Sequence, residues 1–307
     1  MIYYIYIGFI LLLFFIMIKK IYKYNEGLEN MSTNIGNYLS SYFRSLMISI
    51  VNKVDFVYDD SNEDFIKYFP KKIQYNYDEI REQLLKNKID SYYFENIETD
   101  PLGSWHMKDT KTEKMWHIMK PLIQNIMDDA FLKSNQVKIV DYPVIHFRCA
   151  DVPFVKHRHY HFQKYKFYKD ALDYISYKTN KKYDSVIILY SNTHLSSNTD
   201  KEKCDIYANA LMEYLKTIGY KSIIQNKSNL DDFATLYYAK AVISPGSSYS
   251  FMSGFFGKGV FVSGGHQSEG EAEISGVGEW LFKGYNVMHN EINNYYETDD
   301  VIKILSN

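Results

Sequence analysis

The chain has 307 residues, with 35 Lys and Arg against 37 Asp and Glu, so its formal net charge is −2. This length allows one large domain or two of ordinary size, and the near-zero charge gives no support to nucleic-acid binding. The two cysteines, Cys149 and Cys204, build neither a disulfide framework nor a zinc-type Cys-x-x-Cys spacing, and they leave the redox compartment undetermined.

The first 20 residues predict a membrane anchor. Residues 1–18 carry no charge, and Lys19, Lys20 and Lys23 follow at once; a helix needs about 17–25 apolar residues to span a bilayer. A cleaved signal peptide fits less well, because no basic residue precedes the run and no small-residue cleavage site follows it. We therefore expect an uncleaved, single-pass transmembrane helix. Its orientation stays open, since the basic cluster favours the cytosolic face whereas a Golgi-type enzyme of the endomembrane system faces the lumen.

Two segments separate this anchor from the most regular part of the chain. Residues 21–61 are largely polar and predict a stem or linker, in which the amphipathic patch 38–51 is either a stem helix or the first packed helix of the globular part. Residues 62–136 predict an N-terminal helical region. Apolar residues at helical spacing over 116–126 predict a helix there, which Pro121 should kink or restart.

Residues 137–307 predict a Rossmann-like α/β domain. Short apolar runs alternate with helical patterns, which is typical of a parallel sheet. The strand candidates are 138–140 with 144–147, then 185–190, 222–225, 241–244 and 260–262, and the helix candidates are 167–177, 203–218 and 231–239.

The first polar segment of this domain is His146-Phe147-Arg148-Cys149-Ala150-Asp151, which follows a buried strand. Arg148 offers a planar fork of donors that holds phosphate oxygens in pairs. Asp151 either orients that guanidinium or contacts a hydroxyl group. The simpler interpretation is a structural Arg–Asp pair at a strand end.

Two further segments have the same character. A strand runs into Ser244-Pro245-Gly246-Ser247-Ser248-Tyr249-Ser250, where backbone amides and serine hydroxyls at a helix start suit an anion, although a serine N-cap explains the pattern as well. The pair Asp231–Asp232 opens a helix, where acids stabilise the helix dipole or accept hydrogen bonds from a base or ribose.

In this order, the segments resemble the GDP-fucose-dependent fucosyltransferases of the alpha-1,2/alpha-1,6/protein-O-fucosyltransferase group, in particular the alpha-1,2 type. The likeness covers roughly residues 144–257 and rests on His-x-Arg-x-x-Asp, Tyr-Ser-Asn at 190–192, Leu-Asp-Asp-Phe and Ser-Pro-Gly-Ser-Ser-Tyr-Ser. It implies a GT-B-like glycosyltransferase fold whose C-terminal domain binds the nucleotide-sugar donor, with residues 62–136 as a helical or acceptor-side region. It also implies metal-independent transfer of fucose from GDP-fucose to a glycan acceptor in glycan biosynthesis.

The resemblance implies roles for single residues. Arg148 matches the Arg that holds the donor diphosphate, and His146 matches the His that lies near the nucleotide. Asp232 matches the carboxylate that reads guanine, with Asp231 as an equally fair alignment. The phosphate-loop positions match Ser247, Ser248 and Ser250.

The chain departs from the family pattern at three places: Cys149 replaces a second Arg, Ala150 replaces Gly, and Phe251-Met252 replaces two tryptophans. These departures leave a catalytically inactive glycan- or nucleotide-binding relative as the alternative. In an active enzyme, Arg148 and the serine loop would stabilise the charge of the departing diphosphate. Asp151 or a histidine of 157–161 is the candidate general base.

No metal or other cofactor is expected, and GDP-fucose is a substrate. The alternating histidines His157, His159 and His161 would share one face of a strand, but no further ligand lies at a familiar zinc spacing. We expect them to form a cationic rim around the donor or acceptor.

Overall fold

The structure is a computed structural model that describes residues 35–58, 65–96, 110–149, 152, 161–190, 198–264, 286–288 and 298–307. The chain divides into two compact units, Met1–Asn34 and Ile35–Asn307, and all the described residues belong to the second. The predicted anchor over residues 1–20 lies outside the described residues. Among the helices that are described, none is both long enough and apolar enough to cross a membrane.

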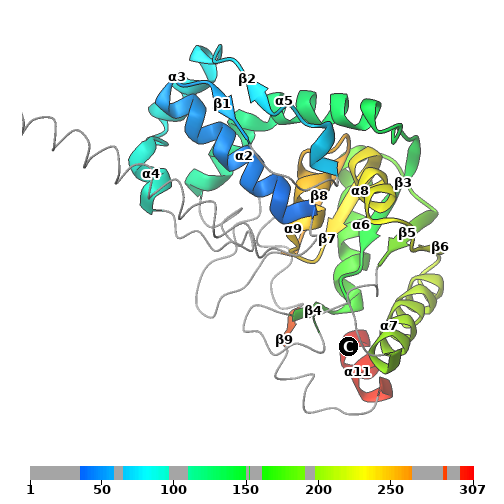
Figure 1. The fold of residues 1–307 in the computed structure, drawn as a ribbon. Coiled ribbons are helices and arrows are strands. Elements are labelled where there is room, and N and C mark those ends of the chain that lie inside the picture. The colour runs from blue at the N-terminus through cyan, green and yellow to red at the C-terminus, as the bar shows by residue number, and fades with distance from the viewer. Residues whose placement is uncertain are drawn as a thin grey trace, which may run out of the picture. The chain divides into compact units, whose positions relative to one another are not determined.

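A five-stranded parallel sheet forms the centre of the second unit (Figure 1). The strands lie in the order β6-β5-β3-β7-β8, and each neighbouring pair is parallel. By order of appearance this is 3-2-1-4-5, which is compatible with a Rossmann-like fold. The predicted strands are confirmed as β3 (Val140–His146), β5 (Ser185–Leu189), β6 (Lys221–Gln225), β7 (Ala239–Ser244) and β8 (Val260–Ser263).

Helices pack on both faces of this sheet. Ile145 of β3 and Phe147, just after the strand, share a buried apolar cluster with α6 (Tyr165–Thr179), α7 (Asn198–Thr217) and α11 (Thr298–Ser306). Successive side chains of a strand point to opposite faces, so His146 points to the other face. That face meets α8 (Asn229–Tyr238), α9 (Ser248–Ser250) and the π-helical turn η3 (Phe251–Phe255). The helices predicted at 167–177, 203–218 and 231–239 are confirmed as α6, α7 and α8.

The chain leaves the adjacent strands β3 and β7 toward opposite faces. After β3 it passes through β4 (His161–Gln163), which pairs with β9 (Asn286–Met288), and then enters α6. After β7 it enters α9 and η3 on the other face. Such a switch between neighbouring strands opens a crevice at their carboxyl ends, where α/β sheets bind ligands.

The part of the chain before β3 packs against the α9–η3 side. Helix α2 (Ile35–Asn52) is buried along most of its length and contacts both α9 and η3, so the amphipathic patch at 38–51 is a packed helix. Its Tyr42 makes edge contacts with the rings of Phe56 and Phe69. The remaining elements are β1 (Phe56–Val57), η1 (Phe65–Tyr68), β2 (Lys72–Ile73), α3 (Asp78–Lys86), α4 (Ser91–Asn96) and α5 (Thr110–Lys133).

Pro121 lies inside α5, which continues through it as one helix. The expected restart of the helix at Pro121 is therefore wrong. Met119 and Ile123, on either side of the proline, are fully buried. Apolar burial on this scale offsets the cost of about 3 kcal/mol that an internal proline carries.

Candidate functional site

Of the predicted site residues that the structure describes, His146, Arg148 and the serines lie at the carboxyl ends of β3 and β7, and Asp232 lies at the start of α8, which follows β6. His146 is the last residue of β3, Arg148 lies two residues further on, and the serine loop follows β7. Gly246 turns the chain out of β7 with a φ of 90°, a left-handed conformation that L-residues with side chains rarely adopt. This glycine sets the direction in which the serine loop crosses the end of the sheet.

His146 and Ser250 join the two strands through buried hydrogen bonds. The Nδ1 atom of His146 lies 2.9 Å from the Ser250 hydroxyl, which lies 2.7 Å from the Ser244 hydroxyl. The amide of Gly246 donates to the same Ser244 oxygen at 3.1 Å. His146 and both serines are at most 8% exposed, so this chain of bonds fixes the imidazole at the sheet edge.

The hydroxyls of Ser247 and Ser248 also have partners within the protein. The Ser247 hydroxyl caps α9 by accepting from the Tyr249 amide at 3.3 Å. The Ser248 hydroxyl donates to Oδ1 of Asn37 in α2 at 2.7 Å. The three predicted serines therefore shape the loop and hold it to its neighbours.

Tyr249 links the serine loop to α8. Its ring lies 5.5 Å from the His146 ring and 5.1 Å from the Phe233 ring, measured between centroids. Its hydroxyl donates to the carbonyl of Asn229 at 2.6 Å. Desolvation, and then the negative charge of Asp232, raise the pKa of Tyr249 well above its ordinary value. Sequence reasoning missed this residue, although it stands inside the Ser-Ser-Tyr-Ser motif.

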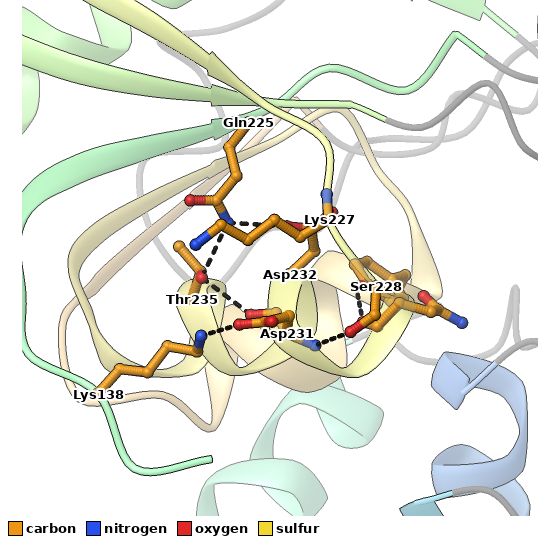
Figure 2. Close-up of polar contacts among 9 residues, drawn as sticks. Lys138, Gln225, Lys227, Ser228, Asp231, Asp232 and Thr235 are labelled. Atoms are coloured by element: carbon orange, nitrogen blue, oxygen red, sulfur yellow. Dashed lines mark hydrogen bonds and ion pairs between the residues drawn. The ribbon is translucent and has the colours of Figure 1, made fainter.

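Asp232 lies in the first turn of α8 (Figure 2). One carboxylate oxygen accepts from Nε2 of Gln225 at 2.7 Å, and the other accepts from the amide of Lys227 at 3.0 Å. The side chain is 3% exposed. Burial raises the pKa of Asp232 above its ordinary value, and the two hydrogen bonds partly oppose that rise.

Asp231 points elsewhere, toward Lys138 (Figure 2). The hydrogen bond from the Lys138 ammonium lowers the pKa of Asp231 below its ordinary value. The sequence left the two aspartates as equal candidates. The structure separates them, because Asp232 is the one whose charge acts on Tyr249.

Arg148 is half-buried and precedes a disulfide bond between Cys149 and Cys204 of α7. The expectation that the two cysteines build no disulfide framework is therefore wrong. The two cysteines are 55 residues apart in the sequence, and this spacing did not indicate the pairing. They meet because the segment after β3 and helix α7 pack on the same face of the sheet. Asp151 lies outside the described residues.

Among the described residues, no group of three or more His, Cys, Asp or Glu side chains is placed to hold a metal ion. His161 begins β4, while His157 and His159 fall outside the described residues.

No family model, curated protein or solved structure matches this chain.

Proposed function

We propose that this protein is a membrane-anchored glycosyltransferase with a GT-B-like fold, which moves fucose from GDP-fucose to a glycan acceptor without a metal. The observation that carries the proposal is the meeting of three separate motifs at one switch point of the sheet. His146 ends β3 and Arg148 follows it, Ser250 comes from the loop after β7, and Asp232 is linked to them through Tyr249. Switch points of this kind are where α/β sheets bind nucleotides.

Asp232 is the contact that we assign to the guanine base. Each of its oxygens accepts one hydrogen bond within the protein, and a carboxylate oxygen accepts two. The ionised group can therefore also accept from the two neighbouring N–H groups of guanine. The existing bonds from Gln225 and the Lys227 amide hold the carboxylate in position for that task.

Arg148 is the contact that we assign to the diphosphate. Its guanidinium stays charged at any working pH and pairs with two oxygens at once. During transfer, the bond between the sugar carbon and the diphosphate oxygen breaks and negative charge builds on the diphosphate. A cation held at that place interacts more strongly with the transition state than with the bound donor, and so it lowers the barrier to transfer. The acceptor oxygen forms the new bond to the sugar carbon and gives up its proton to a general base, for which Asp151 or a histidine of 157–161 is the candidate.

The disulfide bears on which side of the membrane the enzyme works. Disulfides form and persist in oxidising compartments and are rare in the cytosol. Cys149 and Cys204 are both fully buried, so their bond is protected from reductants. We propose that the described unit faces the lumen or the cell exterior, the opposite of what the basic cluster after the anchor favours.

One observation favours a second candidate, a nucleotide- or glycan-binding relative without catalytic activity. Cys149 stands where the resembled family has a second Arg, and it is bonded to Cys204. The disulfide fixes the backbone beside Arg148 but supplies no charge. A single Arg would still bind a diphosphate, but it would stabilise the leaving group less.

Turnover of the donor separates the two candidates. Full-length protein in detergent is incubated with labelled GDP-fucose and, in parallel, with UDP- and CMP-linked sugars, and release of free sugar is measured. We expect GDP-fucose to be hydrolysed and Arg148→Ala to slow hydrolysis by roughly 100-fold or more. Lys240→Ala removes an exposed cation at the amino end of β7 and should leave the rate unchanged.

The other results are equally informative. A rise in the melting temperature of the protein with GDP, without release of free sugar from GDP-fucose, would support the inactive relative. An Arg148→Ala variant with the wild-type rate would remove Arg148 from the mechanism.

A further inference from the structure

Gln163, the last residue of β4, carries a buried amide that has no hydrogen-bond partner. The residue is fully buried, and within the described part of the chain neither its Nε2 nor its Oε1 is bonded. A flip of the amide changes nothing, because both atoms lack a partner. Buried polar groups are nearly always paired, and an unpaired one is costly. An unpaired buried amide of this kind is suited to hydrogen bonds with a bound ligand.

The amide lies at the same end of the sheet as the candidate site. A Cβ atom added to Gly264 would lie 2.5 Å from Nε2 and 2.8 Å from Cδ of Gln163. Any side chain at position 264 would therefore clash with the amide, and glycine avoids that clash. Gly264 follows β8, and its own amide donates to the carbonyl of Ser244 at 2.9 Å. Ser244 is bonded through its hydroxyl to Ser250, so Gln163 borders the hydrogen-bonded group at the end of β7.

Gln163 and Asp232 mark opposite ends of this edge. Asp232 is bonded to Gln225, the last residue of β6, and β6 is one border of the sheet. The amide of Gln163 lies next to Gly264, which directly follows β8, the strand at the other border. Four strand spacings of about 4.8 Å separate the two borders, which gives roughly 19 Å. Between them lie the ends of β3 and β7, with His146 and Arg148.

The chemistry of the amide selects the group that it would bind. A carboxamide is neutral and offers donors on one side and an acceptor on the other. A phosphate group only accepts hydrogen bonds, so it would leave Oε1 unpaired. Neighbouring sugar hydroxyls both donate and accept, so they satisfy both atoms of the amide. A base edge would do the same, but the base end of the site is at Asp232.

We propose that Gln163 binds neighbouring hydroxyls of the donor sugar. The inference rests on the proposed function, because it takes the base from Asp232 and the diphosphate from Arg148. A nucleoside diphosphate sugar laid along the edge in that order has its sugar at β8, beside Gln163. Gln163 is then a substrate contact that distinguishes the sugar from the nucleotide part of the donor.

The test is Gln163→Leu in the full-length protein, with thermal unfolding and with calorimetric titration of GDP and of GDP-fucose. Without ligand, we expect the variant to melt at or above the wild-type temperature, since an unpaired buried amide is removed. GDP should bind as it does to the wild type. GDP-fucose should bind ~10- to 100-fold more weakly, the effect of losing one or two buried hydrogen bonds.

Gln124→Leu is the matched control, because Nε2 of Gln124 donates to the carbonyls of Phe256 and Gly257 at 3.0 and 3.1 Å. This variant should melt at a lower temperature and bind both ligands normally. A lower melting temperature of Gln163→Leu with unchanged affinity for GDP-fucose would show that the amide is structural and would overturn the inference. Equal weakening of GDP and GDP-fucose would overturn the assignment to the sugar. If the wild type binds neither ligand, the proposed function fails, and the sugar assignment fails with it.

Discussion

Asp231 and Asp232 are neighbours in the sequence, but their carboxylates have opposite electrostatic surroundings. The Asp232 carboxylate is buried and next to Tyr249, and desolvation raises its pKa. The Asp231 carboxylate is partly exposed and paired with Lys138, which lowers its pKa. Folding therefore shifts the two titrations in opposite directions from an unfolded value of about 3.9.

We expect opposite pH dependences from Asp232→Asn and Asp231→Asn. Because the pKa of Asp232 is higher in the native state than in the unfolded state, the native state holds this proton to a higher pH than the unfolded state does. The contribution of Asp232 to stability therefore falls as pH rises from ~4 through its native pKa. The wild type should therefore lose stability relative to Asp232→Asn between about pH 4 and that pKa. Asp231 contributes stability above pH ~4 that disappears as pH falls, and its pair is worth at most about 1 kcal/mol because it is partly exposed.

Urea unfolding of the wild type and both variants across pH 3–7 measures these differences. The two variants serve as controls for each other, because each removes one negative charge from the same helix turn. If the stability difference for Asp232→Asn were constant with pH, the carboxylate would not be desolvated as the structure has it.

At the residue scale, the sequence indicated which segments matter better than which side chains act. His146, Asp232 and Ser250 were predicted from motifs; the structure joins His146 to Ser250 by a hydrogen bond, while Asp232 is bonded to Gln225 and Lys227. Tyr249 and Gln163 were missed, because the interest of each depends on its surroundings: a ring between His146 and Phe233, and an amide without a partner. Such surroundings are set by residues distant in the sequence.

At the scale of elements, helix α2 holds the serine loop in place through Gly36 and Asn37. A Cβ atom on Gly36 would lie 2.5 Å from the backbone nitrogen of Tyr249, so the two segments approach as closely as backbones can. The Ser248 hydroxyl donates to Asn37 one residue further on. The position of the loop at the sheet edge thus depends on a helix about 200 residues earlier in the chain.

We expect Gly36→Ala to destabilise the protein by about 1–3 kcal/mol, because the added methyl group forces α2 away from α9. Alanine favours a helix more than glycine does, so propensity alone would give the opposite sign. Ser41→Ala, at a partly exposed position of the same helix, is the control and should change stability by less than about 0.5 kcal/mol. Urea denaturation of the three proteins decides between packing and propensity, and a Gly36→Ala variant that is more stable than the wild type would contradict the close contact.

The disulfide between Cys149 and Cys204 connects the end of β3 to α7. The loop that it closes spans 55 residues, for which chain-entropy arguments give about 4 kcal/mol of stabilisation. We expect the double variant Cys149→Ser/Cys204→Ser to lose about 2–4 kcal/mol in guanidinium unfolding. Reductant should destabilise the wild type and leave the double variant unchanged. Two free thiols in the unreduced, denatured wild type would contradict the pairing.

At the scale of elements, the alternation of short apolar runs and helical patterns after residue 137 was sufficient to predict the strands and helices of the sheet. Each of these elements shows its own period in the sequence. The close packing of α2 on the serine loop was not predicted, since it depends on a single glycine meeting a distant backbone. The sequence left open whether Pro121 kinks the helix or restarts it; the helix continues, because buried side chains on both sides of the proline offset the local signal.

At the scale of the whole molecule, the strand order places the candidate site. The sequence predicted a parallel sheet but not the order of its strands. Without that order, it is not known which neighbouring strands have their following segments on opposite faces of the sheet. Once β3 and β7 are neighbours, the motifs that follow them meet without further assumption. The same topology determines that the two cysteines are close enough to bond and where the two ends of the proposed donor site lie.

The central claim is that the edge formed by β3 and β7 holds a diphosphate next to a guanine-binding carboxylate. Calorimetric titration of GDP and of guanosine into the full-length wild type, Arg148→Ala and Lys240→Ala tests it most directly, because the difference between the two ligands isolates the diphosphate. We expect the wild type and Lys240→Ala to bind GDP at least ~10-fold more tightly than guanosine, and Arg148→Ala to lose most of that difference, since a charged hydrogen-bonded pair is worth about 1.5–3 kcal/mol. Equal affinity of the wild type for GDP and guanosine, or no binding of either, would contradict the claim.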